Sequence, residues 1–255
     1  MSTPLDATDV IETLEENVRE TAAASEQPKY DNLQNYLGTE LKVAGLRSPQ
    51  ISDIYNQMQF PASFTVADKM TFWEEVWFRN EWFELMSMAL LFIRKQGKKL
   101  PPDFLLERLV LWEDRIDNWA HSDELAHALA TLLPIRKSEI LSQLASWNKD
   151  ANPWKRRQSV VAAIRIRQNI GTHLDWNELN RLILPLIKDG VYFVQKGVGW
   201  ALREAGMVYP EKLQAFLTEN CATLPSPAFA TAVEKVPLKE KEIYKSIRRK
   251  SRLNR

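Results

Sequence analysis

Apolar side chains recur every three to four residues along most of the chain, as Val10, Leu14 and Val18 do near its start. This spacing places them on one face of a helix, whereas the two-residue alternation typical of strands is not seen. Pro, Asp, Asn and Gly residues interrupt the pattern and mark turns. Beyond a helix that starts at Ser48-Pro49, the pattern predicts helices over residues 9–24, 33–46, 70–77, 81–94, 104–112, 122–132, 137–147, 154–168, 176–186, 193–205, 210–220 and 226–233.

Two of these helices lie in similar segments that begin thirty-nine residues apart. Residues 150–162 read D-A-N-P-W-K-R-R-Q-S-V-V-A, and residues 189–201 read D-G-V-Y-F-V-Q-K-G-V-G-W-A. Trp154 aligns with Phe193, and Arg157 aligns with a lysine, so each copy carries an aromatic and a cation one turn apart. Helical repeats of this length are typical of HEAT solenoids. We therefore predict an all-α, superhelical solenoid of HEAT-like helical repeats with a concave basic face.

The composition fits one folded repeat region with a short extension at each end. Hydrophobic residues make up 45% of the 255 residues and charged residues 26%, as in ordinary globular proteins, and the eight glycines are few for a turn-rich fold. We predict an N-terminal helix within residues 1–28, packed on or preceding the solenoid, and a HEAT-like repeat domain over residues 29–234. Residues 235–255 carry nine Lys or Arg and two Glu, which predicts a basic, partly disordered tail.

The net charge of +1 conceals a strong asymmetry along the chain. Residues 1–144 hold 14 Lys or Arg against 23 Asp or Glu, a balance of −9, whereas residues 145–255 hold 20 against 10, a balance of +10. A basic half favours a polyanionic partner, because cations that neutralise phosphates release counterions. Ordinary scatter of surface charge is the alternative explanation.

Several classes of site are excluded by the motifs that the sequence lacks. The three histidines, His121, His127 and His173, do not have the spacing of metal ligands, and no phosphate-binding glycine loop or nucleophile elbow is present. Gly197 and Gly199 lie inside a helical pattern, where small residues permit close helix packing. We therefore expect neither a metal nor a cofactor.

The sequence also bears on where the protein acts. Its single cysteine, Cys221, excludes an intramolecular disulfide and indicates a reducing compartment. The first residues have no secretory pattern, and the longest apolar run, residues 88–93, is too short to span a bilayer. We therefore expect a cytoplasmic protein that does not act at a membrane.

Aromatic and cationic side chains alternate along one face of the helix predicted at residues 193–205. Phe193, Lys196, Trp200 and Arg203 follow one another at intervals of three, four and three residues. Such a face suits contact with a nucleic acid, because it combines positive charge with flat apolar rings. Packing between repeats for the aromatics and solvation for the cations are the competing interpretations.

Whether a second pair of side chains shares a helix face depends on where the helix near residue 120 begins. Trp119 and Asp123 are four residues apart and share a helix face if the helix begins as early as Asn118. If Ser122 caps the helix instead, Trp119 lies in the approach loop.

Several of these segments resemble the motifs of a known family. Residues 194–204 (V-Q-K-G-V-G-W-A-L-R-E) resemble the K-A-[IV]-G-W-x-L-R-E motif of the AlkD-like, HEAT-repeat DNA alkylation repair glycosylases. Residues 152–157 resemble the N-x-W-x-[RQ]-R segment of that family, residues 46–49 its early G-[IL]-x-x-P turn, and residues 81–84 the helix that follows. The resemblance extends from about residue 32 to residue 236.

The resemblance implies a DNA repair glycosylase that hydrolyses the N-glycosidic bond of N3- or N7-alkylated, cationic purines in double-stranded DNA without base flipping. With this function we expect a monomer that acts on nucleoid DNA in the cytoplasm. By position, Trp119 and Trp200 would contact the deoxyribose of the lesion, and Asp123 would stabilise the charge on the sugar. Arg157 would be the cation beside them. The implied contacts with the rest of the DNA are made by Trp154, Lys155, Arg156, Lys196 and Arg203.

Three functional classes remain open from the sequence. The family segment S-W-W-D-x-V-D corresponds here to residues 117–123 (D-N-W-A-H-S-D), which keep the spacing from Trp119 to Asp123 but have Ala120 in place of an acid. Asp117 is therefore a second candidate for the carboxylate. A non-catalytic relative that binds damaged or branched DNA and a HEAT-type protein–protein scaffold are the alternatives to the enzyme.

Overall fold

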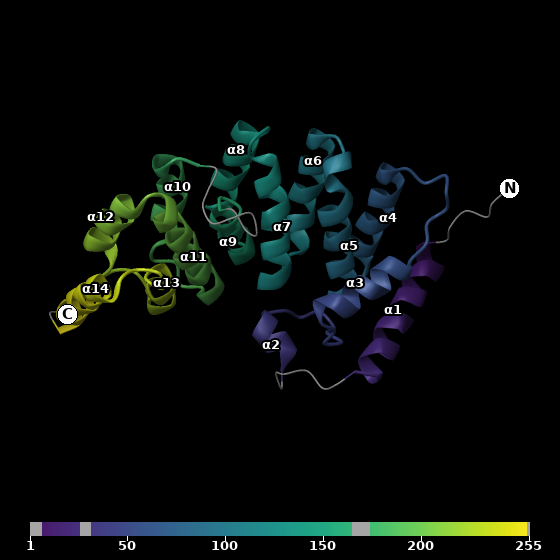
Figure 1. Ribbon diagram of the computed structural model, residues 1–255, viewed down its shortest axis with the longest axis horizontal. Helices are drawn as coiled ribbons and strands as arrows, with labels where there is room; N and C mark the ends of the chain where they lie inside the picture. The colour runs from purple at the N-terminus through teal and green to yellow at the C-terminus, as the bar shows by residue number, and fades with distance from the viewer. Residues whose placement is uncertain (1–6, 26–31, 165–173, 254–255) are drawn as a thin grey trace. The chain divides into compact units, whose positions relative to one another are not determined.

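The computed structural model describes residues 7–25, 32–164 and 174–253, and helices dominate all three ranges (Figure 1). Within them the regular structure is mainly α-helices and short 3₁₀ turns, and Lys42 and Trp82 form an isolated β-bridge. The predicted all-α helical repeat fold is confirmed. The chain divides into two compact units, residues 1–124 and 125–255, and α7 crosses from one into the other. The boundaries that the sequence places at residues 28 and 235 stay predictions.

The helices of the first unit vary in length from one turn to more than four. They are α1 (Ala7–Ala23), α2 (Leu33–Leu37), α3 (Ser48–Gln57), α4 (Val66–Arg79), α5 (Phe83–Gln96), α6 (Pro102–Trp112) and the start of α7 (Trp119–Leu132).

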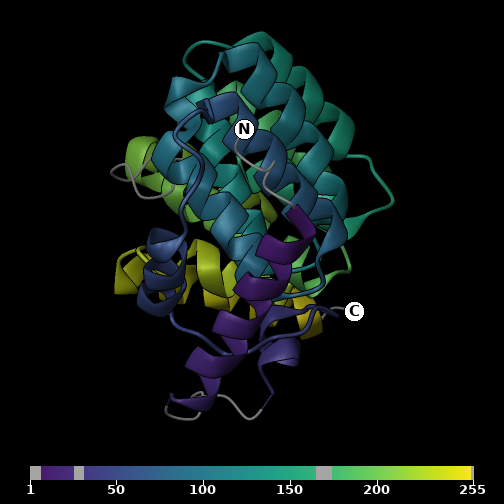
Figure 2. The same ribbon diagram turned by 90° about the vertical axis from the view of Figure 1, so that its right-hand side faces the viewer.

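Tryptophans from α4 and α6 form the centre of the first unit. Trp77 stacks on Trp112 with ring centroids 4.8 Å apart, and its indole N–H donates to the Trp112 carbonyl at 3.1 Å. Trp73, Trp77 and Trp112 are fully buried, so the aromatic segment at residues 70–77 belongs to the core. The α1 helix lies beside α3, as both views show (Figures 1 and 2), and buries Leu14 and Val18.

The helix expected over residues 33–46 is wrong, because α2 ends at Leu37. Gly38 follows with φ of 78°, a left-handed conformation that glycine adopts without strain and that ends the helix. Beyond it, the backbone N–H groups of Ala44, Gly45 and Leu46 all donate to the carboxylate of Glu84 on α5, at 2.8–3.3 Å. These donors are therefore satisfied by a side chain rather than by a helical turn.

The helices of the second unit alternate with short turns. They are α8 (Lys137–Trp147), α9 (Pro153–Val161), α10 (Trp176–Ile183), α11 (Tyr192–Val208), α12 (Pro210–Asn220), α13 (Ser226–Ala232) and α14 (Leu238–Leu253). The last part of the helix expected at residues 154–168 and the histidine at position 173 lie outside the described residues.

Helix α11 packs against both α9 and α13, so the two repeat copies are direct neighbours. Close approach to α13 requires Gly199, because a Cβ there would lie 2.5 Å from the Ala228 carbonyl oxygen and 2.8 Å from the Thr231 Cβ. At Gly197 the Arg157 side chain fills the space, 3.2 Å from where a Cβ would be. The prediction that these two glycines permit close packing is confirmed.

The basic segment at the C-terminal end differs from the partly disordered tail expected from its composition. Leu238–Leu253 form helix α14, which buries Tyr244 and Arg248. A charged residue, Arg248, supplies part of the anchor, and for this reason apolar periodicity alone did not reveal the helix. None of the helices in the described part of the chain is long and apolar enough to cross a bilayer.

Candidate nucleic-acid interface

The start of α7 places two of the predicted site residues on one helix face. The helix begins at Trp119, and the buried Asn118 caps it by accepting a hydrogen bond from the His121 backbone N–H at 2.8 Å. Ser122 lies inside the helix and is fully buried. Trp119 and Asp123 are therefore one turn apart and share a face, as the first of the two sequence interpretations requires.

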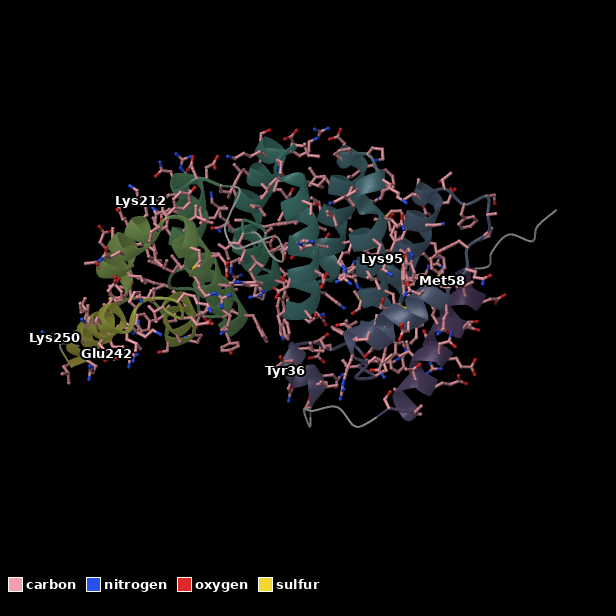
Figure 3. The ribbon with its side chains drawn as sticks, in the orientation of Figure 1. Tyr36, Met58, Lys95, Lys212, Glu242 and Lys250 are labelled. Carbon is pink, nitrogen blue, oxygen red and sulfur yellow. The ribbon has the colours of Figure 1, made fainter. Side chains whose placement is uncertain are left out.

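Trp119 is held by a residue that the sequence did not single out. Its indole N–H donates to the carbonyl oxygen of Tyr36 on α2 at 2.9 Å, and the two rings meet edge to face at 5.5 Å. The Tyr36 side chain is 42% exposed and stands at the surface of α2 (Figure 3). The two residues are 83 positions apart in the chain, and no local pattern links them.

The two candidate carboxylates have different surroundings. The Asp117 carboxylate accepts hydrogen bonds from the Thr39 hydroxyl at 2.7 Å, the Glu40 backbone N–H at 3.0 Å and the Asn118 amide at 2.9 Å. It therefore ties the segment after α2 to the start of α7. Asp123 lies a turn and a half further along and is partly exposed on the Trp119 face. These three hydrogen bonds give Asp117 a structural role at the start of α7.

A buried histidine fixes the helix start from inside the unit. His121 is 1% exposed and stacks on Phe83 at 4.3 Å. Its Nδ1 lies 2.9 Å from the Asn118 amide nitrogen, which can only donate, so Nε2 carries the proton and faces the Ser87 hydroxyl at 2.9 Å. Burial lowers the His121 pKa from 6.5 to about 4, partly offset by the Asp117 charge and the Phe83 carbonyl. The imidazole is therefore neutral near pH 7 and holds α7 in place.

In the second unit, the equivalent aromatics of the two repeat copies stack directly. Trp154 on α9 lies over Phe193 on α11 with ring centroids 5.0 Å apart, and both are partly exposed. Arg157, one turn after Trp154, is 4% exposed and donates to the Phe193 carbonyl at 2.9 Å. The aromatic pair thus forms a surface with a buried guanidinium behind it.

The other two cations of α9 are engaged near the turns that precede the repeats. Arg156 pairs with the Asp189 carboxylate at 2.7 Å and donates to the carbonyls of Asp150 and Ala151. Because this guanidinium is largely buried and bonded on several sides, its main role is to join the two repeat turns. Lys155 lies 3.7 Å from the Asp150 carboxylate.

Along α11, each predicted DNA-binding side chain has an intramolecular partner. The Trp200 indole N–H and the Arg203 guanidinium both donate to the Glu204 carboxylate, at 3.0–3.1 Å. Arg203 also pairs with Glu234 at 2.6 Å, and Lys196 donates to the Thr231 hydroxyl at 2.9 Å. Glu234 is half exposed, so its ion pair is weak enough for a phosphate to replace it.

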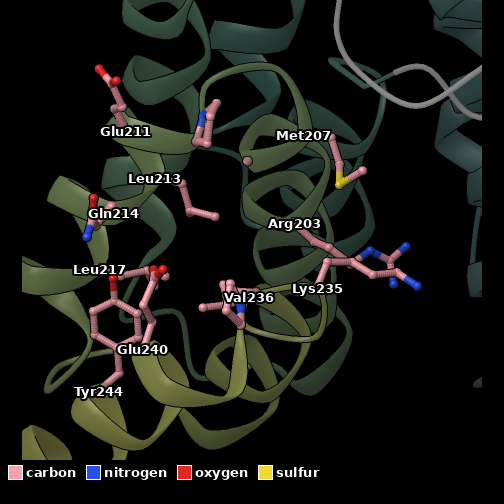
Figure 4. A pocket seen from close by; sticks show the side chains of 14 residues that line it. Arg203, Met207, Glu211, Leu213, Gln214, Leu217, Lys235, Val236, Glu240 and Tyr244 are labelled. Atoms are coloured by element: carbon pink, nitrogen blue, oxygen red, sulfur yellow. The ribbon is translucent and has the colours of Figure 1, made fainter.

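A cavity of about 250 Å³ adjoins this helix between α11, α12 and the start of α14 (Figure 4). Leu213, Leu217 and Val236 make much of its wall apolar. The side chains of Arg203 and Lys235 extend on the opposite side of it from Tyr244. The cavity is therefore largely apolar, and it shares Arg203 with the aromatic and cationic face of α11.

The family follows from the comparison of the whole chain with known proteins. Residues 18–236 match the family model described as DNA alkylation repair enzyme. The chain belongs to the DNA alkylation repair enzyme family. Membership gives the protein a role in DNA repair and implies that it binds DNA. The resemblance seen in the sequence is thereby confirmed.

One solved structure has a similar fold. The structure described as "Predicted DNA alkylation repair enzyme from Enterococcus faecalis" has a TM-score of 0.65 at 17% identity, covering 86% of this chain and 96% of that one. Smu.31 from Streptococcus mutans UA159 covers 94% of each chain at 16% identity, but its TM-score of 0.46 is too low to establish a shared fold. The search of curated proteins found no significant match.

Within this repair-family fold, the predicted site residues fall into two sets. Trp119 and Asp123 belong to the first unit. The second unit contains all the others, namely Trp154, Lys155, Arg156, Arg157, Lys196, Trp200 and Arg203. Among the described residues, no three His, Cys, Asp or Glu side chains cluster as ligands for a metal ion. The residues that the sequence missed are the partners of these side chains, above all Tyr36 and Glu204, whose roles depend on contacts that only the fold creates.

Proposed function

We propose that the protein is a monofunctional DNA glycosylase that removes N3- and N7-alkylated purines from duplex DNA. The observation that carries the proposal is the start of α7, where Trp119 and Asp123 lie one turn apart on a partly exposed face. Membership of a DNA alkylation repair family supports the substrate class. Asp117, the competing carboxylate, is engaged by Thr39 and Glu40.

The proposed reaction needs few catalytic groups from the protein. An alkylated purine is cationic, so the electron pair of its glycosidic bond can leave with it and yield a neutral base. The deoxyribose is then left with positive charge shared between C1′ and the ring oxygen. The Asp123 carboxylate stabilises this charge and accepts the proton of the water that adds to C1′, which gives an abasic sugar. Fixed charge placed where charge develops contributes about 3–4 kcal/mol to catalysis.

The aromatic residues supply contacts rather than proton transfer. Trp119, held by the Tyr36 carbonyl, presents a fixed ring beside Asp123. In the second unit, Trp200 and the Trp154–Phe193 stack are proposed as DNA contacts, together with Lys196 and Arg203. None of these assignments requires the base to be extruded, so we propose excision without base flipping, unlike most duplex glycosylases.

The test is the release of 7-methylguanine from methylated duplex DNA, with the enzyme in excess and an unmethylated duplex as the control. The proposal predicts free methylated base and matching abasic sites, and no release from the control. If no base is released although DNA binding remains steeply salt-dependent, the protein is a non-catalytic DNA-binding relative. The substitution of an acid by Ala120 within residues 117–123 is the observation that keeps this second candidate open.

A further inference from the structure

Helix α14 carries a concentrated positive charge on one side. Residues 238–253 contain seven Lys or Arg and two Glu, a balance of +5 over sixteen residues. Lys245, Arg249 and Arg252 follow one another at intervals of four and three residues and are all exposed. This spacing puts the three cations on the same face of the helix.

Buried contacts hold this face in a defined position on the second unit. Arg248 is 8% exposed, lies over the Phe229 ring at 4.3 Å and donates to the carbonyls of Cys221 and Leu224. Tyr244, one turn earlier, is 4% exposed. The exposed cations therefore belong to a docked helix rather than to a loose tail.

A basic groove of about 400 Å³ runs along this face, and we call it the α14 groove. It is lined by Phe229, Glu242, Lys245, Arg248, Arg249 and Arg252. Its acidic member, Glu242, is exposed at the surface of α14 (Figure 3) and pairs with Lys245 at 2.7 Å. Four cations against one carboxylate leave a local balance of +3. Because exposed ion pairs are weak, an incoming anion can displace Glu242.

We propose that the α14 groove binds the phosphate backbone of duplex DNA, as a contact additional to those of α7, α9 and α11. The proposal rests on the DNA-binding part of the proposed function and not on base release. Charge complementarity identifies the partner, because closely spaced phosphates match cations that repeat along one helix face. Helix α14 begins at residue 238, beyond the residues 18–236 that match the repair-family model, so this surface is an addition to the matched region.

The test removes the three exposed cations together and measures how DNA affinity depends on salt. Each phosphate contact contributes about 0.9 to the slope of log affinity against log salt. Lys245→Ala/Arg249→Ala/Arg252→Ala should therefore lower the slope by about 2.7. Between about 50 and 200 mM salt, affinity should fall about 40-fold less in this variant than in the wild-type protein. Anisotropy of a labelled, undamaged duplex measures this directly.

A matched control removes the same charge from exposed positions outside the groove. Arg181→Ala/Lys188→Ala/Lys212→Ala takes three cations from the same unit, among them Lys212 on α12 (Figure 3). Its slope should change by less than one phosphate contact. Arg249→Ala alone should lower the slope by about 0.9, which keeps the test valid if the triple variant folds poorly.

The outcomes separate the two proposals. If the groove variant keeps the wild-type slope, the α14 groove does not bind DNA. An equal decrease of the slope in the groove and control variants would also contradict the proposal, because it would reflect net charge alone. Because the duplex is undamaged, failure of base release leaves this result unaffected. A wild-type protein without salt-dependent DNA binding would overturn the groove together with the DNA contacts of the proposed function.

Discussion

Lowering the pH should destabilise the protein through one buried side chain, His121. The folded state holds its imidazole neutral with a pKa of about 4, against an ordinary value of 6.5. Between these values the unfolded chain binds the proton and the folded protein does not, so stability falls as the pH drops. A difference of about 2.5 pKa units corresponds to about 3 kcal/mol in total, of which about 2 kcal/mol is lost between pH 7.5 and 5. Below pH 4 the loss is complete.

Urea unfolding followed by tryptophan fluorescence at several pH values measures this dependence. His121→Gln removes the titrating group and leaves a neutral polar side chain. Between pH 7.5 and 5, the unfolding free energy of this variant should therefore decrease by about 2 kcal/mol less than that of the wild-type protein. The variant will be less stable than the wild type near neutral pH, because the stacking on Phe83 is lost, but only the pH dependence is diagnostic. If wild type and variant lose equal stability between pH 7.5 and 5, the buried, neutral imidazole inferred for His121 is wrong.

Two further predictions concern packing in the second unit. Gly199→Ala should destabilise the folded protein by about 1–2 kcal/mol, because the clash with the Ala228 carbonyl outweighs the gain in helix propensity. The control is Gly190→Ala, whose added Cβ has no atom within 4 Å, and it should change stability by about 0.5 kcal/mol or less. Thermal melts that show equal effects would contradict the close approach of α11 and α13. Arg248→Met should cost about 2–4 kcal/mol because two buried carbonyls lose their charged donor, while Arg249→Ala should be nearly neutral. Equal melting temperatures would mean that α14 is not anchored by the guanidinium.

Sequence periodicity predicted those parts of the fold that depend on neighbouring repeats. The alignment of Trp154 with Phe193 anticipated that these two residues occupy equivalent places on adjacent helices, and their rings do stack. Gly199 was correctly interpreted as a packing position because the helical pattern continues on both sides of it. Both inferences use information within about one repeat length.

The sequence failed where a distant side chain decides the local conformation. The segment after Gly38 has helical periodicity, but the Glu84 carboxylate takes three of its N–H groups from forty residues away. Helix α14 has few apolar anchors, and its Arg248 bonds to carbonyls more than twenty residues earlier. Such pairs leave no periodic trace in one sequence.

The candidate site, too, could be predicted only in part from the sequence. The sequence identified Trp119 and Asp123 by spacing but left the start of their helix open between two caps, and the Asn118 hydrogen bond to the His121 N–H resolves it. The structural contacts of Asp117 also needed the fold, because the Thr39 hydroxyl and the Glu40 backbone N–H that bond to its carboxylate lie almost eighty residues earlier in the chain.

The most direct test of the proposed chemistry compares these two carboxylates in single-turnover release of 7-methylguanine. Asp123→Asn keeps the shape of the side chain and removes its charge, so the rate should fall about 100- to 1,000-fold. Asp117→Asn retains an oxygen that can accept from Thr39 and should change the rate less than about tenfold. The reverse order, or equal rates for Asp123→Asn and the wild-type protein, would contradict the assignment of Asp123 as the catalytic carboxylate.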